Sequence, residues 1–370
     1  MKFNRISFAA SLGVLACAAN AQSSVTLYGT VDQYLSRLKS SSGTTITSLE
    51  DGTTLRSRLG LRGEEDLGGG YKAKFQLEMG LYADSGSQAD TTRAFDRQAW
   101  VGVAAPYGEL RFGRQNGIIF YRGDYIDFTS RTLGSVVNAF GTPSRYDNDL
   151  SYISPRLGGF LFEAHYALGE STAGASSQAV YQLGLDYLNG PFRVGYAGIT
   201  GKAPDGAAVP QSMRYDNLYA NYDYGNGKVY AVYIRSNNNA ASGTLNNGGS
   251  ILGNVGGVVA GTNAEATRFY RITQISGDYN VTPVLRVGAL YGQIKDTSGN
   301  GKNANGFGIG AYYSLSKRTT LVALVHSLRN DPNAGFRPSG SAAVRANFTA
   351  AADVNGKTIN GLALGVVHRF

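Results

Sequence analysis

The sequence is poor in residues that form disulfides or bind metals, and it offers no membrane-spanning helix. Cys17 is the only cysteine, and the histidines His165, His326 and His368 lie far apart in no metal-binding spacing. Beyond the N-terminal segment there is no apolar run of about 18 residues. We therefore expect no disulfide framework, no cofactor and no metal, and stability must come from backbone hydrogen bonds and packing.

Charge is also scarce. Asp, Glu, Lys and Arg make up 16% of the chain, against roughly 25% in soluble domains. Glycine and tyrosine are abundant instead, with 50 and 24 residues. The net charge of +8 is spread along the chain without a clustered patch, which argues against nucleic-acid binding. This composition suits a wall with an apolar face, aromatic borders and tight turns.

The N-terminus has the organisation of a secretory signal peptide. Lys2 and Arg5 precede an apolar run over residues 6–18, and small residues at 19–21 form a cleavage pattern. The sequence predicts a signal peptide over residues 1–21, which contains Cys17, and a mature domain over residues 22–370.

Most of the mature chain alternates between apolar and polar residues with a period of two. In residues 71–82, Ala73, Phe75 and Leu77 share one face, whereas Lys74 and Glu78 lie on the other. Such alternation predicts strands, although it does not by itself separate a lipid-facing wall from a soluble sandwich. Segment length, tight turns that alternate with long loops, and the export signal favour a membrane wall.

Sixteen segments of about ten residues each follow this pattern, as a bilayer-spanning strand requires. They are residues 24–35, 53–63, 71–82, 95–105, 107–114, 145–153, 159–169, 178–189, 191–200, 214–224, 227–236, 266–280, 283–295, 303–315, 318–329 and 360–370. The low-complexity connections 237–261 and 330–359 read as flexible external loops. The predicted fold is all-β, a 16-stranded antiparallel transmembrane β-barrel.

The last strand supports closure of this barrel. Leu362, Leu364 and Val366 alternate with Ala363 and Val367, and the chain ends on Phe370. A terminal strand with an open edge promotes aggregation, whereas pairing with the first strand removes both edges. Closure is obligatory in lipid because no water satisfies stray backbone groups there.

Four stretches of the mature chain resemble the signature stretches of Gram-negative porins of the β-proteobacterial (Burkholderia, Bordetella, Neisseria) type. They are SVTLYG at 24–29, SRLGLRGEEDLGGG at 57–70, RQAWVG at 97–102 and YSLSKRT at 313–319. The resemblance implies an outer-membrane barrel, usually trimeric, whose third long loop (115–144) folds inward to constrict the pore. Gly306, Gly308 and Gly310 form a small-residue face that could serve subunit packing.

The same resemblance implies residue roles. Asp124 and Asp127 would supply the acidic side of the constriction, and Arg58, Arg97 and Arg145 the basic wall opposite. Strand parity agrees, since an arginine facing lipid at mid-depth costs roughly 2–4 kcal/mol; Arg97, for example, opposes Trp100, which we expect to face lipid. Further lumen candidates are Arg56, Arg62, Lys74 and Glu78. Phe370 resembles the signal read by the barrel assembly machinery.

The predicted function is passive diffusion of small hydrophilic solutes and ions through a water-filled channel with a mild preference for anions. Two alternatives stay open: a channel with a saturable binding site for one solute class, and a barrel that acts mainly in adhesion or envelope stability. No catalytic motif indicates an enzyme. The expected partners are solutes, outer-membrane lipid and lipopolysaccharide, the assembly machinery and two further copies of the chain.

Overall fold

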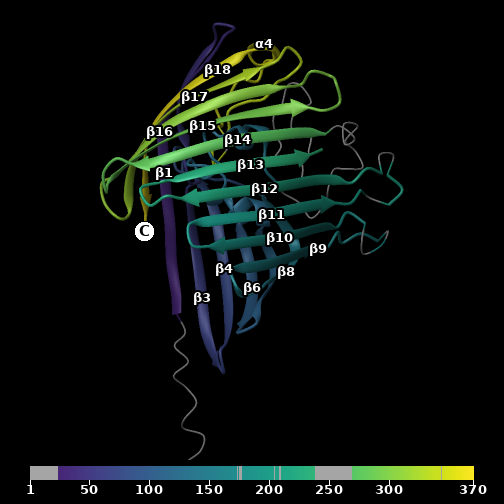
Figure 1. The fold of residues 1–370 in the computed structure, drawn as a ribbon. Coiled ribbons are helices and arrows are strands. Elements are labelled where there is room, and N and C mark those ends of the chain that lie inside the picture. The colour runs from purple at the N-terminus through teal and green to yellow at the C-terminus, as the bar shows by residue number, and fades with distance from the viewer. Residues whose placement is uncertain are drawn as a thin grey trace, which may run out of the picture.

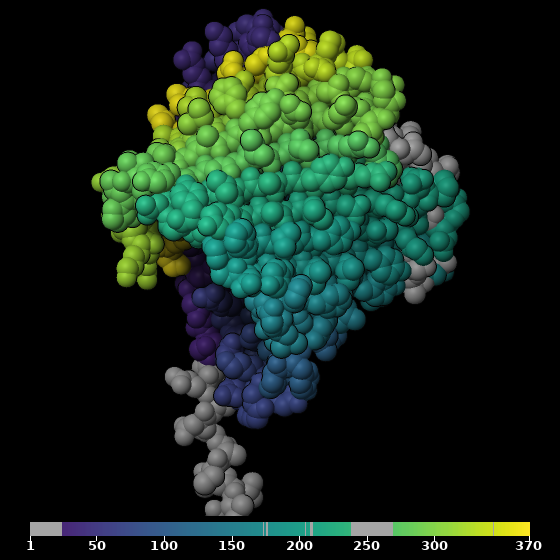
Figure 2. Space-filling model, in the orientation of Figure 1, coloured from purple at the N-terminus to yellow at the C-terminus, as the bar shows by residue number. Residues whose placement is uncertain are grey.

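The computed structural model describes residues 24–370, apart from 173, 175–176, 204, 208–209, 238–268 and 343. The predicted signal peptide therefore lies outside the described residues, as does most of the predicted loop 237–261. Tilted antiparallel strands run side by side around a closed wall (Figure 1), and the space-filling view shows a continuous outer surface over β10–β15 (Figure 2). None of the described helices is long and apolar enough to cross a membrane.

Among the described residues, the wall consists of 16 strands, as the sequence predicts. They are β1 (Ser24–Ser40), β3 (Arg58–Gly68), β4 (Tyr71–Tyr82), β6 (Gln98–Ala105), β7 (Gly108–Asn116), β8 (Arg145–Ile153), β9 (Phe160–Ala167), β10 (Val180–Asn189), β11 (Phe192–Gly201), β12 (Met213–Asp223), β13 (Lys228–Ser236), β14 (Tyr270–Asn280), β15 (Leu285–Asp296), β16 (Ala304–Ser314), β17 (Thr319–Asn330) and β18 (Thr358–Arg369). Two accessory strands, β2 (Thr45–Asp51) and β5 (Ser87–Gln88), extend β1 and β4.

The first and last strands close the wall. β1 pairs with β18 from Thr30 opposite Arg369 to Ser40 opposite Ile359. Phe370 and Gly29 exchange two backbone hydrogen bonds of 3.1 and 3.0 Å, so the pairing continues to the C-terminal residue. This closure satisfies the backbone donors and acceptors at both edges, which a bilayer demands.

Alternation along the strands sorts side chains between the outer surface and the interior. In β10, Leu183 and Leu185 are exposed on the outside, while Gln182 and Asp186 are buried inside. β4 follows the predicted pattern, because Lys74 and Glu78 make ion pairs inside the barrel. The apolar outer face is thus a property of nearly every strand, as lipid contact requires.

One predicted strand begins later than expected. Residues 53–57 leave the wall, and β3 starts only at Arg58. The buried carboxylate of Asp32 on β1 accepts hydrogen bonds from the backbone N–H groups of Thr53, Thr54 and Leu55 at 2.8–3.0 Å. These bonds hold residues 53–55 as a protrusion into the barrel, where Thr54 and Leu55 line its cavities.

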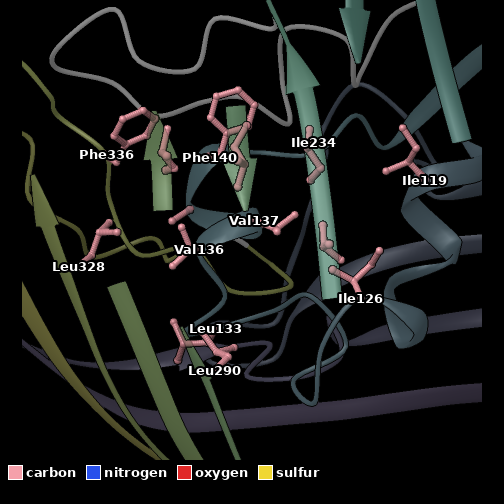
Figure 3. Packing of buried hydrophobic residues seen from close by; sticks show 14 of the residues in the cluster. Ile119, Ile126, Leu133, Val136, Val137, Phe140, Ile234, Leu290, Leu328 and Phe336 are labelled. Carbon is pink, nitrogen blue, oxygen red and sulfur yellow. The ribbon is translucent and has the colours of Figure 1, made fainter. Parts of the chain in front are cut away.

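The long connection between β7 and β8 folds into the barrel. It contains α1 (Ile118–Tyr121), the 3-10 helix η1 (Gly123–Tyr125) and α2 (Val136–Phe140). We call residues 117–144 the inner segment. Its apolar side chains pack against inward residues of the wall, as Figure 3 shows for Leu133 beside Leu290. The apolar core of this barrel is therefore the contact between the inner segment and one side of the wall.

The glycines of β16 serve this contact. A Cβ on Gly308 would lie 3.2 Å from the carbonyl oxygen of Gly134. A Cβ on Gly306 would lie 3.2 Å from the Val136 side chain, and a Cβ on Gly310 would lie 3.1 Å from the Phe128 ring. The small-residue face therefore points into the barrel and lets the inner segment approach the wall. The expectation that this face serves packing between subunits is therefore wrong, because the inner segment covers it.

The connection between β17 and β18 also turns inward, contrary to the expectation of a flexible external loop. Phe336 is fully buried, and its ring centroid lies 6.2 Å from those of Phe140 and Tyr270. A short helix, α4 (Ala351–Val354), follows. Asp353 of α4 accepts hydrogen bonds from Ser42 and Thr44 at the tip of the β1–β2 hairpin. Residues 331–357, which we call the upper strap, thus cover the inner segment.

Candidate pore constriction

Three basic residues and one acid meet where four strands begin or end. Arg58 opens β3, Arg145 opens β8, Arg97 directly precedes β6, and Glu78 lies near the end of β4. Glu78 accepts a hydrogen bond from Arg97 Nε at 2.6 Å, and Arg58 Nη1 lies 3.7 Å from the same oxygen. One carboxylate therefore faces two guanidinium groups, which leaves an excess of positive charge.

Arg145 adds to this excess. Its side chain is buried and its guanidinium lies 4.5 Å from the ring centre of Phe120 in α1. Within the described part of the chain, Arg145 Nε and Nη2 have no hydrogen-bond partner. Buried guanidinium groups usually have every donor satisfied. Two unsatisfied guanidinium nitrogens beside two other arginines are therefore a local source of positive field.

The inner segment contributes a further arginine that the sequence analysis missed. Arg131 lies 4.7 Å from the ring centre of Phe120, and burial lowers the pKa of its guanidinium from the usual value. Together with Arg58, Arg97 and Asp124 it lines a cavity of about 220 Å³. Nothing in the local sequence distinguishes Arg131 from a solvated loop residue, because its position depends on the inward fold.

Asp124 borders several cavities inside the barrel. It is exposed on η1 and lines three separate cavities: the one just described, and two of about 350 and 370 Å³ that border Arg286. Ser130 lines the same three cavities. The carboxylate of Asp124 thus borders the same cavity as Arg58 and Arg97.

Asp127 is placed differently. Its carboxylate is buried and accepts hydrogen bonds from Thr129 N, Arg131 N, Ser135 Oγ and Gln274 Nε2, at 2.7–3.0 Å. Gln274 belongs to β14 of the wall, so Asp127 joins two turns of the inner segment to the barrel. These donors stabilise the negative charge of Asp127. The residue therefore fixes the inner segment to the wall and does not present a free carboxylate to the pore.

The other predicted lumen residues lie inside the barrel at two levels. Arg56 stands beside the constriction, 5.0 Å from the ring centre of Tyr82. Arg62 stacks on Tyr28, and Lys74 pairs with Glu109 at 3.0 Å. Arg62 and Lys74 line a separate cavity of about 480 Å³ together with Arg111 and Trp100. The structure therefore divides the predicted set into a constriction group and a group at the other end.

Trp100 corrects one step of the parity argument. Its indole N–H donates to Gln98 Oε1 at 3.0 Å and Arg111 stacks on its ring, so Trp100 faces the interior. Val101 and Val103 carry the exposed outer face of β6. Arg97 nevertheless reaches the interior because it precedes the first residue of β6, where strict alternation no longer applies.

A buried ionic network fixes the start of the inner segment. Arg122 donates to Glu163 at 3.0 Å, Glu163 contacts His165 at 3.0 Å, and His165 contacts Asp149 at 2.7 Å. Tyr121 donates to the same Glu163. Alternation along β9 turns Glu163 and His165 inward, whereas their partner Arg122 comes from a loop about 40 positions away.

Phe370 lies at the seam of the wall. Its ring covers Gly29, where a Cβ would approach the ring to 2.2 Å, and the residue is about half exposed. The terminal aromatic is thus both the end of the closing ladder and a partly accessible surface group.

Comparisons with known proteins agree with this architecture. The sequence matches the Gram-negative porin family over residues 8–333. It is 30% identical to an outer membrane porin protein of Bordetella pertussis, covering 85% of this chain and 91% of that protein. Among solved structures, an anion-selective porin from Comamonas acidovorans superposes with a TM-score of 0.74 at 24% identity, covering 94% of this chain and 100% of the other.

A trimer form of OmpT from Vibrio cholerae shares the fold with a TM-score of 0.63 at 15% identity, covering 94% of this chain and 99% of the other. The closed wall, the inward segment, the facing charges and the family match lead to one conclusion. The chain belongs to the Gram-negative porins and is an outer-membrane channel for the passive diffusion of small hydrophilic solutes.

Proposed function

We propose that this porin prefers anions, and that the preference arises from Arg58, Arg97 and Arg145 facing Asp124 across the constriction. The observation that carries the proposal is the charge imbalance: Arg97 and Arg58 face the single carboxylate of Glu78, and the buried guanidinium of Arg145 has no ion-pair partner within the described residues. A narrow passage between low-dielectric walls focuses such a field on a permeating ion. The name of the Comamonas porin describes that protein as anion-selective, which supports the same choice here.

Replacing Arg97 by Gln tests this proposal. One charge about 6 Å from a permeating ion contributes about 0.7 kcal/mol in water. We therefore expect the anion-to-cation permeability ratio to fall roughly three-fold or more, as measured from reversal potentials in a KCl gradient across planar bilayers.

Lys39→Gln is the matched control, because Lys39 is exposed on the outer side of β1, away from the interior cavities. If both variants shift the reversal potential equally, general surface charge sets the selectivity and the constriction assignment fails.

The unsatisfied donors of Arg145 favour a second candidate, a saturable site for an anionic solute. Nε and Nη2 of this buried side chain have no partner in the described residues, and an oxyanion fits such a fork of donors. Conductance that saturates with increasing concentration of an organic anion would support this candidate, whereas linear conductance supports simple diffusion. A barrel with no conductance would instead favour the adhesive or stabilising role.

We also propose that the chain forms homotrimers, is assembled through recognition of Phe370 by the barrel assembly machinery, and associates with lipopolysaccharide. The trimer form of the Vibrio protein supports the first of these. Migration on gels without heating, in mild detergent, tests it: a purely monomeric band argues against the trimer.

A further inference from the structure

Three basic residues form a row on the outer surface of neighbouring strands. Arg235 of β13 lies directly opposite Arg271 of β14, and Arg271 lies directly opposite Lys295 of β15. All three are exposed. Because adjacent strands are about 4.8 Å apart, the three charges span only about 10 Å. We call these residues the basic row.

The basic row continues two rows of residues that face outward along the same strands. From the middle of the wall toward the strand ends, the three rows are Ala231–Ile275–Tyr291, Tyr233–Thr273–Gln293 and Arg235–Arg271–Lys295. Ile275 is 65% exposed, as a lipid-facing residue is in an isolated chain. Successive rows are about 7 Å apart along a strand, so the basic row lies just beyond the apolar zone.

The position of the row identifies the side of the membrane. It lies at the strand ends that carry the long connections, whereas the opposite ends of β14 and β15 are joined by the short turn at residues 281–284. Short turns face the periplasm in this class of barrel, so the basic row lies at the level of the outer-leaflet headgroups.

Like charges directly opposite one another destabilise a sheet, so this arrangement needs a compensating anion. Within the described residues, none of the three cations takes part in an ion pair. Asp216 of β12 lies opposite Arg235 on the same face and accepts the Tyr196 hydroxyl at 2.6 Å, so one carboxylate stands beside three cations. Arg235 also stacks on Phe269 at 4.6 Å, which orients its guanidinium.

We propose that the basic row binds the phosphate groups of a multiply phosphorylated glycolipid of the outer leaflet, whose acyl chains lie against the two rows below. Arginine suits this role because its planar fork binds phosphate in a bidentate manner. A lipid with one phosphate carries at most about two negative charges at one point, whereas two phosphates can contact all three cations across about 10 Å. The proposal rests on the lipopolysaccharide association proposed above and locates its site.

The test uses the full-length mature protein in detergent, titrated with diphosphoryl lipid A, monophosphoryl lipid A and inorganic phosphate. We expect the native protein to bind the diphosphoryl lipid about ten-fold more tightly than the monophosphoryl lipid. The variant R235Q/R271Q/K295Q should lose this difference and weaken binding at least ten-fold or so. Heat-modifiable migration on gels checks that the variant remains folded.

Neutralising Lys317 and Arg318 provides the matched control, because both are exposed in the turn between β16 and β17 at the opposite end of the barrel. This K317Q/R318Q variant should bind like the native protein. Equal affinity for both lipids, binding of inorganic phosphate as tight as that of the lipid, or equal losses in the two variants would overturn the proposal. So would loss of self-association with unchanged lipid binding, since the row would then be a protein interface.

Bilayer recordings of the same proteins separate this proposal from the channel function. The basic row lies on the outer face of the wall, so its neutralisation should leave conductance and reversal potential unchanged. A native protein without conductance would contradict the channel, and the lipid titration would still decide on the basic row.

Discussion

At the scale of single residues, Asp124 and Asp127 have different roles because only Asp124 is exposed. Asp124→Asn should raise the anion-to-cation permeability ratio without changing thermal stability, since its carboxylate has no protein hydrogen-bond donors in the described structure and faces the cavities. Reversal potentials and thermal unfolding in detergent measure the two effects. A drop in stability equal to that of an Asp127 variant would contradict this division of roles.

Asp127→Asn should behave in the opposite way. The amide loses part of the acceptor capacity that five donors use, which costs about 2–3 kcal/mol for a buried group. We expect lower thermal stability of the inner segment and larger fluctuations of the single-channel current, because the variant weakens the hydrogen bond between the segment and Gln274 of β14. A quiet channel of native stability would show that the other contacts of the inner segment suffice.

Residue types and parity predicted which arginines enter the barrel, but not their partners. Arg58 and Arg145 follow from alternation, because charge on the lipid side is costly. Arg97 was correctly predicted to point into the barrel, but the premise that Trp100 faces lipid was wrong. The indole of Trp100 has a hydrogen-bond acceptor, Gln98, and a stacked cation, Arg111, inside the barrel. Arg122 and Arg131 could not be predicted, since their contacts join loop residues to distant strands.

At the scale of elements, alternation predicted the wall strands well and the long connections poorly. A strand carries its own signal in every second residue, whereas the upper strap shows a loop-like composition and is held by contacts with other parts of the chain. Asn138 of α2 donates to the carbonyl oxygens of Ser339 and Gly340 at 2.6 and 3.1 Å, and Phe336 packs on Phe140. No local pattern encodes such contacts.

Phe336→Ala tests whether the upper strap is held by this packing. Truncation of a buried phenylalanine removes roughly 3–5 kcal/mol of packing. We expect faster proteolysis within residues 331–357 and a larger conductance, with the wall intact. Phe160→Ala is the control, because Phe160 is exposed on the outer face of β9. Equal cleavage of both variants would argue that the strap is already open in solution.

At the scale of the whole molecule, the barrel depends on its last residue. Removing Phe370 deletes two backbone hydrogen bonds to Gly29 and the proposed assembly signal. We expect normal export but a reduced folded fraction in the outer membrane, measured by heat-modifiable migration on gels. Restored yield with Phe370→Tyr but not with Phe370→Ala would tie the effect to the aromatic ring; normal yield of the truncated chain would reduce Phe370 to an anchor.

The seam between the first and last strands also sets the order of events during folding. The backbone N–H of Thr358 bonds to the hydroxyl of Ser41, 317 positions away. Contacts of such sequence separation form slowly, because a long loop must close before they contribute. The wall cannot be completed while the chain is still being translocated. Until its C-terminal strand is available for pairing, β1 has an open edge, and the incomplete wall is exposed to aggregation.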